Sequence, residues 1–289
     1  MGVDLVPFKT CSYDCIYCQL GRTTRKTTQC REWIPLDDVL SELKQKLSTK
    51  PNYVTLSGSG EPTLYSRLGE LIAGIRSMTD VPVAVLTNGS MLWHADIRRE
   101  LMDAELVIPS LDAGDAELFQ AINRPHVDVS FASMLEGLVS FGQEFHGRYW
   151  LEVFILSGYN DGGTEIRRLA ECVSRIRPER VQLNTATRPT AEDYAVMVSR
   201  RKLTRLARCF DPPAEVIADY RDVHARAEFQ AGREGVLQLL RRRPCSLGDI
   251  AEGLAMHRNE VIKYVEELHH QGKVEKETTD GKVFYRVTR

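Results

Sequence analysis

The stretch YVTLSGSGEPTLYSRLGELIAGIRSMTDVPVAVLTNG, residues 53–89, decides the fold class of this chain. Its first apolar run, 53–58, predicts a buried strand. Apolar residues then recur with the three- and four-residue spacing of a helix, at Leu68, Leu71, Ile72 and Ile75. A second apolar run, 81–89, predicts another strand that ends in an Asn-Gly turn. A strand, a helix and a strand in this order make up one unit of a parallel sheet.

The same alternation continues along the chain. Further strands are predicted at 106–112, 151–158 and 181–185, and a short first strand before Cys11. Helices are predicted at 36–47, 94–103, 115–122, 130–144, 163–175 and 191–209. A closed barrel of eight units takes roughly 250 residues, which is more than residues 1–212 supply. We therefore expect an α/β domain over 1–212, an open, partial parallel βα barrel of about six units.

The C-terminal part has a different pattern. Helical patterns cover 233–242, 246–254 and 257–271, and two alternating strands follow around Asp280-Gly281, a strong hairpin signal. Three helices followed by a hairpin are typical of a small winged-helix domain. We predict this domain at 233–289, joined to the barrel by a linker at 213–232.

Three cysteines lie close together near the start, in the run CSYDCIYC: Cys11, Cys15 and Cys18. Their C-x3-C-x2-C spacing is one ligand short of the four that a structural zinc takes. An iron–sulfur cubane held by three thiolates instead keeps one iron open. A zinc knuckle with Cys30 as fourth ligand is the alternative, although no His or second C-x2-C accompanies Cys30.

Composition limits the setting and the partners. Seven cysteines in 289 residues, without a signal-peptide pattern at the N-terminus, favour a reducing cytoplasm. The net charge is −2 and the mean hydropathy −0.29, and no apolar run approaches the roughly 20 residues of a spanning helix. We expect no membrane partner, and the near-neutral balance gives no general case for nucleic-acid binding.

Polar and glycine residues follow the predicted strands, where the sites of parallel α/β folds gather. Gly58 and Gly60, on either side of Ser59, lack a Cβ and allow a ligand to approach the backbone closely. Other strand-end or in-strand candidates are Glu61, Asn88, Ser110, Asp112, Glu152, Asn184 and Arg188. Arg124 and His126 lie on a loop and are candidates for substrate contact, with a surface salt bridge as the equal alternative.

Five motifs taken together resemble those of the radical S-adenosylmethionine (SAM) superfamily. Within it, they resemble a subgroup that is often classified with wyosine-tRNA synthase-like proteins. They are the cysteine run with its upstream residues, SGSGEPTL, LTNGS, SLDAGD and VQLNTATRP, and the resemblance covers about residues 2–190. Wyosine synthases carry additional N-terminal cysteines for a second cluster, and in this sequence no cysteine precedes Cys11. Subgroup members usually begin further upstream, so a shortened start is one interpretation of the ten residues before Cys11.

The resemblance implies a set of cofactor contacts. A [4Fe–4S] cluster is expected on Cys11, Cys15 and Cys18, with its open iron holding the amino and carboxylate groups of SAM. The run Gly58–Glu61 is expected to hold the methionine amino group. Ser110 and Asp112 stand where the family contacts the ribose, and Tyr17 is expected to pack beside the adenine. Asn88 and Asn184, at the ends of two predicted strands, are the remaining candidates for SAM contact, with a turn or capping role as the alternative.

The resemblance also implies the chemistry. A reduced cluster cleaves SAM into methionine and a 5′-deoxyadenosyl radical, and the radical abstracts hydrogen from a substrate, which could be a small molecule, a peptide or RNA. An electron donor such as flavodoxin or ferredoxin is the expected partner. The alternative function is an iron–sulfur regulator that binds DNA through a helix beginning at His257–Glu260. Residues 233–289 hold eleven Lys and Arg against nine Asp and Glu, a weak basic excess for that role.

Overall fold

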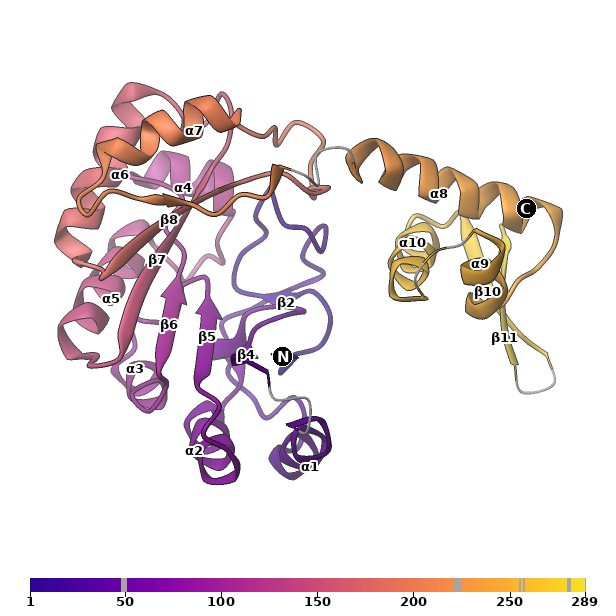
Figure 1. Ribbon diagram of the computed structural model, residues 1–289, viewed down its shortest axis with the longest axis horizontal. Helices are drawn as coiled ribbons and strands as arrows, with labels where there is room; N and C mark the ends of the chain where they lie inside the picture. The colour runs from indigo at the N-terminus through magenta and orange to yellow at the C-terminus, as the bar shows by residue number, and fades with distance from the viewer. Residues whose placement is uncertain (48–50, 221–224, 255, 257, 280–281, 289) are drawn as a thin grey trace. The chain divides into compact units, whose positions relative to one another are not determined.

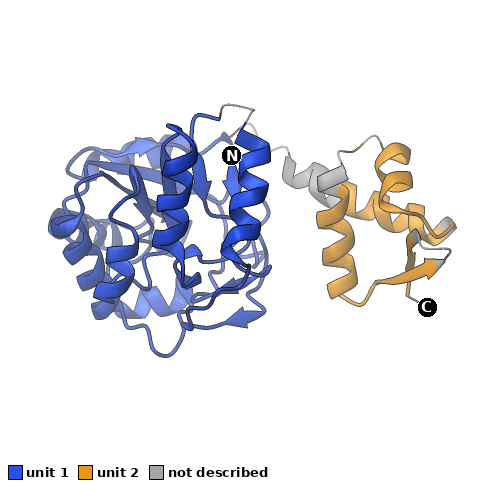
Figure 2. Cartoon of the chain, turned by 90° about the horizontal axis from the view of Figure 1, so that it is seen from below, with its two compact units in different colours: residues 1–220 blue, residues 221–289 orange. Residues whose placement is uncertain are grey.

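The computed structural model describes residues 1–47, 51–220, 225–254, 256, 258–279 and 282–288. The chain divides into two compact units, 1–220 and 221–289 (Figure 2). Each unit has an apolar core of its own. A domain with its own core can fold as an independent body.

A parallel sheet forms the centre of the first unit (Figure 1). Its strands, in spatial order, are β1 (Gly2–Val3), β4 (Val54–Leu56), β5 (Val83–Thr87), β6 (Leu106–Pro109), β7 (Arg148–Ile155), β8 (Arg180–Thr185) and β9 (Glu215–Val216). Every neighbouring pair is parallel, and the spatial order follows the chain. The two end strands, β1 and β9, do not pair with each other. The predicted open parallel barrel is confirmed.

Helices cover the outer face of this sheet (Figure 1). They are α1 (Leu36–Lys46), α2 (Leu68–Met78), α3 (Ala95–Glu100), α4 (Ala116–Asn123), α5 (Phe131–Glu144), α6 (Gly163–Ile176) and α7 (Arg200–Leu206), with 3-10 turns η2 (Pro62–Leu64) and η3 (Ala207–Cys209). Most of them bury apolar residues against the sheet, as α2 buries Leu71 and Ile75. Burying an apolar stripe of this kind stabilises both the helix and the sheet.

The inner face of the sheet is partly open. Leu86 is 36% exposed although β5 lies in the middle of the sheet. Its register partner Ile108 and the paired residues Glu152 and Gln182 are only half-buried. Parallel sheets normally bury both faces. The inner face is therefore less fully covered than the outer face along strands β5 to β8.

A short parallel ladder, β2 (Thr10–Cys11) with β3 (Arg25–Lys26), starts and ends the segment that carries the three cysteines. We call residues 11–24 the cysteine loop. The Glu61 amide donates to the Thr10 carbonyl at 3.1 Å, and the Ile16 amide donates to the Ile122 carbonyl at 2.9 Å. The loop is thus held between the turn after β4 and the C-terminal end of α4.

Two predicted segments have a different structure. The helix predicted at 191–209 begins only at Arg200, after Ser199 caps it. The preceding residues, 186–199, which we call the strap, instead bond to neighbouring elements: the Glu192 amide donates to the Ile16 carbonyl at 3.0 Å.

The predicted linker 213–232 contains β9 and the start of α8, and the division between units falls after residue 220. A two-residue strand leaves no periodic signal in a sequence.

The described residues of the second unit form three helices and two antiparallel strands. Its elements are α8 (Ala225–Arg242), α9 (Leu247–Gly253), α10 (Arg258–His270), β10 (Val274–Thr279) and β11 (Lys282–Val287). β10 and β11 are antiparallel, and an isolated bridge joins Cys245 to Tyr285. Ser246 and Asp249 form a capping box at the start of α9. This order suits the winged-helix prediction, which stays a prediction.

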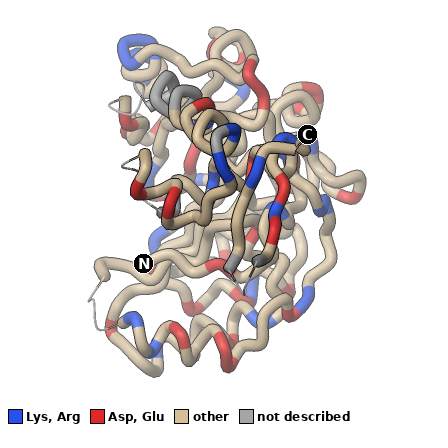
Figure 3. The backbone as a smooth tube through the Cα atoms, turned by 90° about the vertical axis from the view of Figure 1, so that its right-hand side faces the viewer, with Lys and Arg blue, Asp and Glu red and all other residues tan. Residues whose placement is uncertain are grey.

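Part of the predicted DNA-binding helix start and the whole hairpin turn lie outside the residues that the structure describes. His257, the Asp280-Gly281 turn and the side chains of residues 258–260 lie outside the described residues. Basic and acidic residues are interspersed along the backbone (Figure 3), so DNA binding gains no support from the charge pattern. Among the described helices, none is long and apolar enough to cross a membrane.

Candidate functional site

The three cysteine thiols are half-buried at one end of the sheet, and side-chain amides face two of them. The Asn88 Nδ2 lies 3.4 Å from the Cys11 sulfur, and the Tyr13 amide lies 3.5 Å from the same sulfur. The Asn123 Nδ2 lies 3.5 Å from the Cys15 sulfur. Side-chain and backbone N–H groups aimed at sulfur stabilise the thiolate form, which is the form that binds metal.

Burial is the main electrostatic influence on these thiols. It raises the pKa of Cys11 to about 12, with a further contribution from the Glu61 carboxylate. It also raises the pKa of Cys15 and of Cys18. Buried anionic sulfur requires a compensating positive charge, and a bound metal centre deprotonates coordinating thiols outright. The chemistry of this donor set therefore fits a metal cluster.

Cys30 lies apart from this set. Its thiol donates to the Thr63 carbonyl at 3.4 Å, and it packs on a separate apolar cluster that contains Leu64 and Met91. Among the residues that the structure describes, no group of three or more His, Cys, Asp or Glu side chains is arranged to hold a metal ion, with or without Cys30. The arrangement thus gives no support to a zinc knuckle that includes Cys30.

Two orphaned atoms provide a further test of the fit. Among the described residues, the buried side-chain polar atoms without a hydrogen-bond partner are the Tyr13 hydroxyl oxygen and Asn123 Oδ1. Tyr13 lies between Cys11 and Cys15 in the cysteine loop, and Asn123 contacts Cys15. Buried polar atoms in folded proteins almost always have a partner. The residues around the thiols therefore fit an additional polar or ionic group such as an iron–sulfur cluster.

Glu61 connects the ends of two strands. It is 2% exposed, and four donors surround its carboxylate: the Thr63 amide and hydroxyl, the Thr87 hydroxyl and the Asn88 amide. Burial raises the pKa of Glu61, and these hydrogen bonds oppose that rise. The contacts fix the end of β5 against the turn after β4. They also orient Asn88, whose side chain reaches Cys11 and the Ser12 hydroxyl.

The glycines of the SGSGEPTL turn are packed against other atoms of the protein, Gly58 against the Asp4 side chain and Gly60 against the Thr10 backbone. Gly58 has a φ of +129°, a conformation that favours glycine. A Cβ on Gly60 would lie 1.8 Å from the Thr10 carbonyl oxygen, and the Ser59 carbonyl accepts from the Lys9 amide at 2.7 Å. The close approach expected of Gly60 is thus made by the strand that leads into the cysteine loop.

Asp112 ties the cysteine loop to the sheet. Its carboxylate is 3% exposed and accepts from the Tyr17 hydroxyl at 2.5 Å, from Asn123 Nδ2 at 2.7 Å and from the Phe154 amide at 3.1 Å. The Tyr17 ring stacks on Phe154, with centroids 3.9 Å apart. Burial raises the pKa of Asp112, and these donors oppose the rise. Asp112 therefore positions Tyr17, whatever else it contacts.

Three further candidates share the inner face. Ser110 pairs with Glu152 across β6 and β7, and Asn184 Nδ2 donates to the Glu152 carboxylate at 2.8 Å. Burial raises the pKa of Glu152, and the Asn184 hydrogen bond opposes this. All three side chains are half-buried. They form a polar strip on the open face, next to Phe154.

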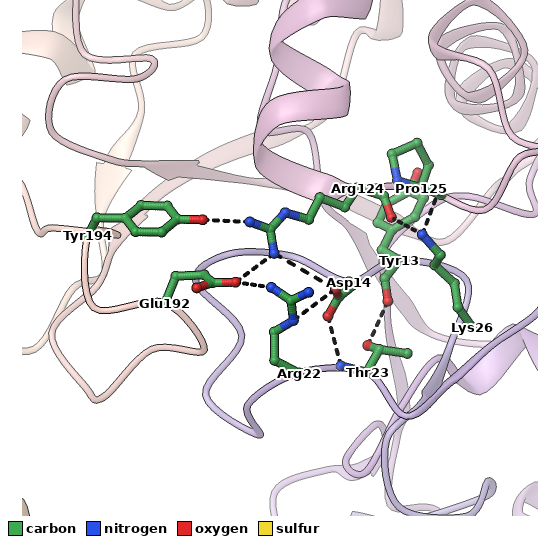
Figure 4. Close-up of polar contacts among 9 residues, drawn as sticks. All are labelled: Tyr13, Asp14, Arg22, Thr23, Lys26, Arg124, Pro125, Glu192 and Tyr194. Carbon is green, nitrogen blue, oxygen red and sulfur yellow. Dashed lines mark hydrogen bonds and ion pairs between the residues drawn. The ribbon is translucent and has the colours of Figure 1, made fainter.

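Arg124 takes part in a network of ion pairs rather than standing free (Figure 4). Its guanidinium donates to Glu192 at 2.7 Å and to the Tyr194 hydroxyl at 2.5 Å. Arg22 pairs with the same Glu192 and, at 3.2 Å, with Asp14. We call these four charged residues and Tyr194 the clasp. The clasp joins the cysteine loop, the end of α4 and the strap.

The remaining loop candidates have local partners. His126 Nδ1 lies 3.2 Å from the Asp128 carboxylate. Arg188 lies 3.5 Å from the Gln19 side-chain oxygen, close to the cysteine loop. Sequence reasoning named Arg124, with a salt bridge as one alternative, but missed its clasp partners, as well as Asn123 and Phe154, because the contacts join residues distant in the chain. For Asn123, its position directly before Arg124, within the run INRPH (122–126), was the one available signal.

Comparison with known proteins completes this picture. The sequence model of the Radical SAM superfamily matches residues 5–170. The chain belongs to the radical SAM superfamily. It is an enzyme of that superfamily, and membership implies SAM and an iron–sulfur cluster as cofactors. The wyosine-synthase-like subgroup stays a prediction.

Several relatives support a shared ancestry along the whole chain. A protein of Brachyspira hyodysenteriae named GTPase Obg is 37% identical over 99% of this chain, which spans only 43% of that relative. A UPF0026 protein of Methanocaldococcus jannaschii is 29% identical over 99% of the chain and 91% of its own length. A UPF0026 protein of Synechocystis is 40% identical over 65% of the chain and 71% of its own length.

Solved structures share the fold of the radical SAM protein. SuiB of Streptococcus suis bound to S-adenosylmethionine superposes with a TM-score of 0.56 at 16% identity, over 75% of this chain and 50% of that one. A radical SAM methyltransferase from Sphaerobacter thermophilus gives a TM-score of 0.55 at 16% identity, over 75% of this chain and 65% of that one. At such identities the comparison establishes the partial barrel, and function is argued from the site.

Proposed function

We propose that this radical SAM enzyme holds a [4Fe–4S] cluster through Cys11, Cys15 and Cys18. When reduced, such a cluster supplies one electron to SAM, whose C–S bond breaks to give methionine and a 5′-deoxyadenosyl radical that abstracts hydrogen from a substrate. The electron comes from a reduced flavodoxin or ferredoxin type of protein. The substrate class stays open between a small molecule, a peptide and RNA.

One observation carries this proposal: two side-chain amides, from Asn88 and Asn123, face the sulfurs of Cys11 and Cys15 at the edge of an open parallel sheet. Hydrogen bonds to cluster sulfurs and partial exclusion of solvent are the means by which proteins tune iron–sulfur centres. Neither amide would need to point at a thiol in a site built only for packing.

The residues of the chain divide the work of binding. The turn Gly58–Glu61 and Asn88 border the cysteine loop and are proposed to contact the methionine part of SAM. Tyr17, stacked on Phe154, forms an apolar wall for the nucleoside part. Ser110, Asp112 and Asn184 are proposed SAM contacts, Asp112 from a position buried beneath Tyr17.

The open inner face provides the space for substrate. Leu86 and Ile108 supply apolar surface there, and Glu152 supplies a carboxylate. A half-enclosed face of mixed polarity keeps a reactive species away from bulk water while it reaches a bound molecule. The protein's contribution is thus to orient the two partners and to shield them.

Anaerobic reconstitution with iron and sulfide, followed by dithionite and SAM, tests the proposal. The wild-type protein should release 5′-deoxyadenosine and methionine. Cys15→Ala should abolish the release, because the cluster loses one of its three ligands. Cys30→Ala is the matched control and should retain it. Release by the Cys15 variant, or one zinc and no iron in protein isolated without oxygen, contradicts the proposal.

A further inference from the structure

The two orphaned buried atoms belong to one small region of the fold. Tyr13 is 2% exposed, and its hydroxyl oxygen has no hydrogen-bond partner in the part of the chain that the structure describes. Asn123, also 2% exposed, leaves its Oδ1 without a partner there while its Nδ2 contacts Cys15 and Asp112. A buried hydroxyl without a partner costs roughly 1–3 kcal/mol, so this position calls for an explanation.

Packing directs the Tyr13 side chain toward the same place as Asn123. The Tyr13 ring meets Phe119 edge to face, with centroids 5.4 Å apart. Phe119 and Asn123 lie four residues apart on α4 and so share one face of that helix. At the other end of the residue, the Tyr13 amide lies 3.5 Å from the Cys11 sulfur. Tyr13 therefore spans the space between the first two cysteines and α4.

The hydrogen-bonding capacity of the neighbouring groups agrees with this placement. A phenol hydroxyl carries one proton that it can donate. The carboxylates of Glu61 and Asp112 already accept from several donors. Among the described residues, a single side-chain donor, Asn123 Nδ2, faces the Cys15 sulfur.

We propose that the Tyr13 hydroxyl donates a hydrogen bond to sulfur of the cluster bound at Cys15, and that this bond raises the reduction potential of the cluster. The inference rests on the proposed function, since it requires the cluster. The physical reason is that the reduced cluster carries one more negative charge than the oxidised cluster. A donor next to its sulfur stabilises the reduced state more strongly. Tyr13 is in this sense a positioning and tuning residue that does not touch the substrate.

The two asparagines extend the same arrangement. Asn88 faces Cys11, and Asn123 faces Cys15 while it also bonds to Asp112. Asp112 in turn accepts from the Tyr17 hydroxyl. Tyr13 would complete a set of three side-chain donors around the first two cysteines. A side-chain donor to the Cys18 sulfur does not occur among the described contacts, so the donors are concentrated on one side of the site.

The variant Tyr13→Phe tests the proposal, because it removes the hydroxyl and keeps the ring that packs on Phe119. Reconstituted wild-type and variant proteins are poised at a series of potentials, and the reduced cluster is quantified by electron paramagnetic resonance. We expect the variant's midpoint potential to be more negative. A tenfold shift of the reduction equilibrium corresponds to about 59 mV for a one-electron couple.

The matched control is Tyr149→Phe. The Tyr149 hydroxyl is also buried but donates to the Leu138 carbonyl at 3.0 Å, away from the cysteines. This control should leave the potential unchanged and lower the urea midpoint of unfolding of the cluster-free protein. Tyr13→Phe should not lower that urea midpoint, because its hydroxyl has no partner to lose before the cluster binds.

The outcomes separate the inference from the function on which it rests. Equal potentials in Tyr13→Phe and wild type, with the cluster present in both, contradict the inference alone. That result is expected if the hydroxyl instead holds a buried water or bonds to Asn123 Oδ1. Absence of the cluster from the wild-type protein contradicts the proposed function and the inference together.

Discussion

At the scale of single residues, the site is built on buried polar groups that hold other residues in place. Glu61 fixes Asn88, and Asp112 fixes Tyr17 and Asn123. Each carboxylate is almost fully buried and is compensated by at least three donors. Removing one partner of such a group costs more than the bond contributes, because the remaining group stays desolvated.

The first prediction concerns Gly60. In Gly60→Ala the new Cβ would lie 1.8 Å from the Thr10 carbonyl oxygen, so the backbone must move. We expect the free energy of unfolding to fall by about 1–3 kcal/mol, as in other overpacked sites, and iron uptake to fall with it. The control, Gly163→Ala, places its Cβ where no atom lies within 4 Å. Equal stabilities of the two variants in urea would count against the description of this turn.

The second prediction concerns pH. Burial raises the folded-state pKa of Glu152 above its unfolded value. Its contribution to stability is therefore complete below the unfolded pKa of about 4.3 and is lost as pH rises through the folded pKa. The free energy of unfolding of the wild-type protein, compared with that of Glu152→Gln, should therefore fall as pH rises above the unfolded-state pKa of Glu152.

Urea unfolding at a series of pH values measures this difference. The control is Glu144→Gln, because a hydrogen bond from Arg98 lowers the pKa of Glu144. That contribution is present above the unfolded pKa and is lost as pH falls, so the control should show the opposite slope. The same slope in both variants would contradict the environment assigned to Glu152.

Sequence reasoning reached part of this residue-level picture. The three cysteines, Tyr17 and the glycine–glutamate turn are visible because they lie within short motifs. Asn123 and Phe154 are not, since their importance arises from contacts with residues far away in the chain. The same holds for Gly60: a missing Cβ is evident from the sequence, but which atom takes its space is decided by the fold.

At the scale of elements, the cysteine loop is a long irregular segment held from several sides. Backbone bonds attach it to the end of α4 and to the strap, and Thr10, directly before the loop, is bonded to the turn after β4. The clasp adds charged contacts between the loop, the end of α4 and the strap (Figure 4). An irregular loop needs such ties, because it lacks the repeated backbone bonds of a helix or a sheet.

The third prediction tests the clasp. Glu192→Gln keeps the shape of the side chain and removes the charge that faces Arg22 and Arg124. We expect a loss of about 1 kcal/mol, which makes local opening of the cysteine loop about fivefold more frequent. Hydrogen exchange of peptides covering 11–24 measures this opening. Glu42→Gln, which removes an exposed pair with Lys46 on α1, should leave these peptides unchanged.

If hydrogen exchange of the cysteine loop is the same in both variants and in wild type, the clasp does not hold the loop.

The strap also shows why some elements could be predicted from the sequence and others could not. Strands β4 to β8 have strong apolar runs, and their order follows from the alternation with helices. Residues 191–199 have helix-compatible composition, but their backbone bonds to Ile16 and to neighbouring segments instead, and the sequence does not reveal that competition.

At the scale of the whole molecule, the chain combines an open barrel with a second compact unit (Figure 2). All candidate site residues lie in the first unit, and so does the family match over 5–170. The second unit has a separate apolar core that includes Val236, Val265 and Leu268. Two independent cores were predictable, because the sequence changes its pattern between them. The position of the division was not, since β9 is too short to be recognised.

The fourth prediction follows from this division. A protein that ends at Tyr220 keeps β9 and the hydrogen bond from the Tyr220 hydroxyl to the Val198 carbonyl. We expect it to bind the cluster and to cleave SAM at the full-length rate. Loss of cleavage in a truncated protein that still binds the cluster would show that the second unit contributes to the site.

A separate expectation concerns DNA. The protein of 289 residues should show no salt-dependent binding to random duplex DNA in a shift assay.

The central claim is that three thiolates of the cysteine loop hold three irons and leave the fourth for SAM. Mössbauer spectra of the 57Fe-reconstituted protein, recorded with and without SAM, test it most directly. We predict a cluster of four irons in which SAM changes the signal of one iron site and leaves the other three unaltered. Identical spectra with and without SAM, in a protein that binds the cluster, would contradict the account.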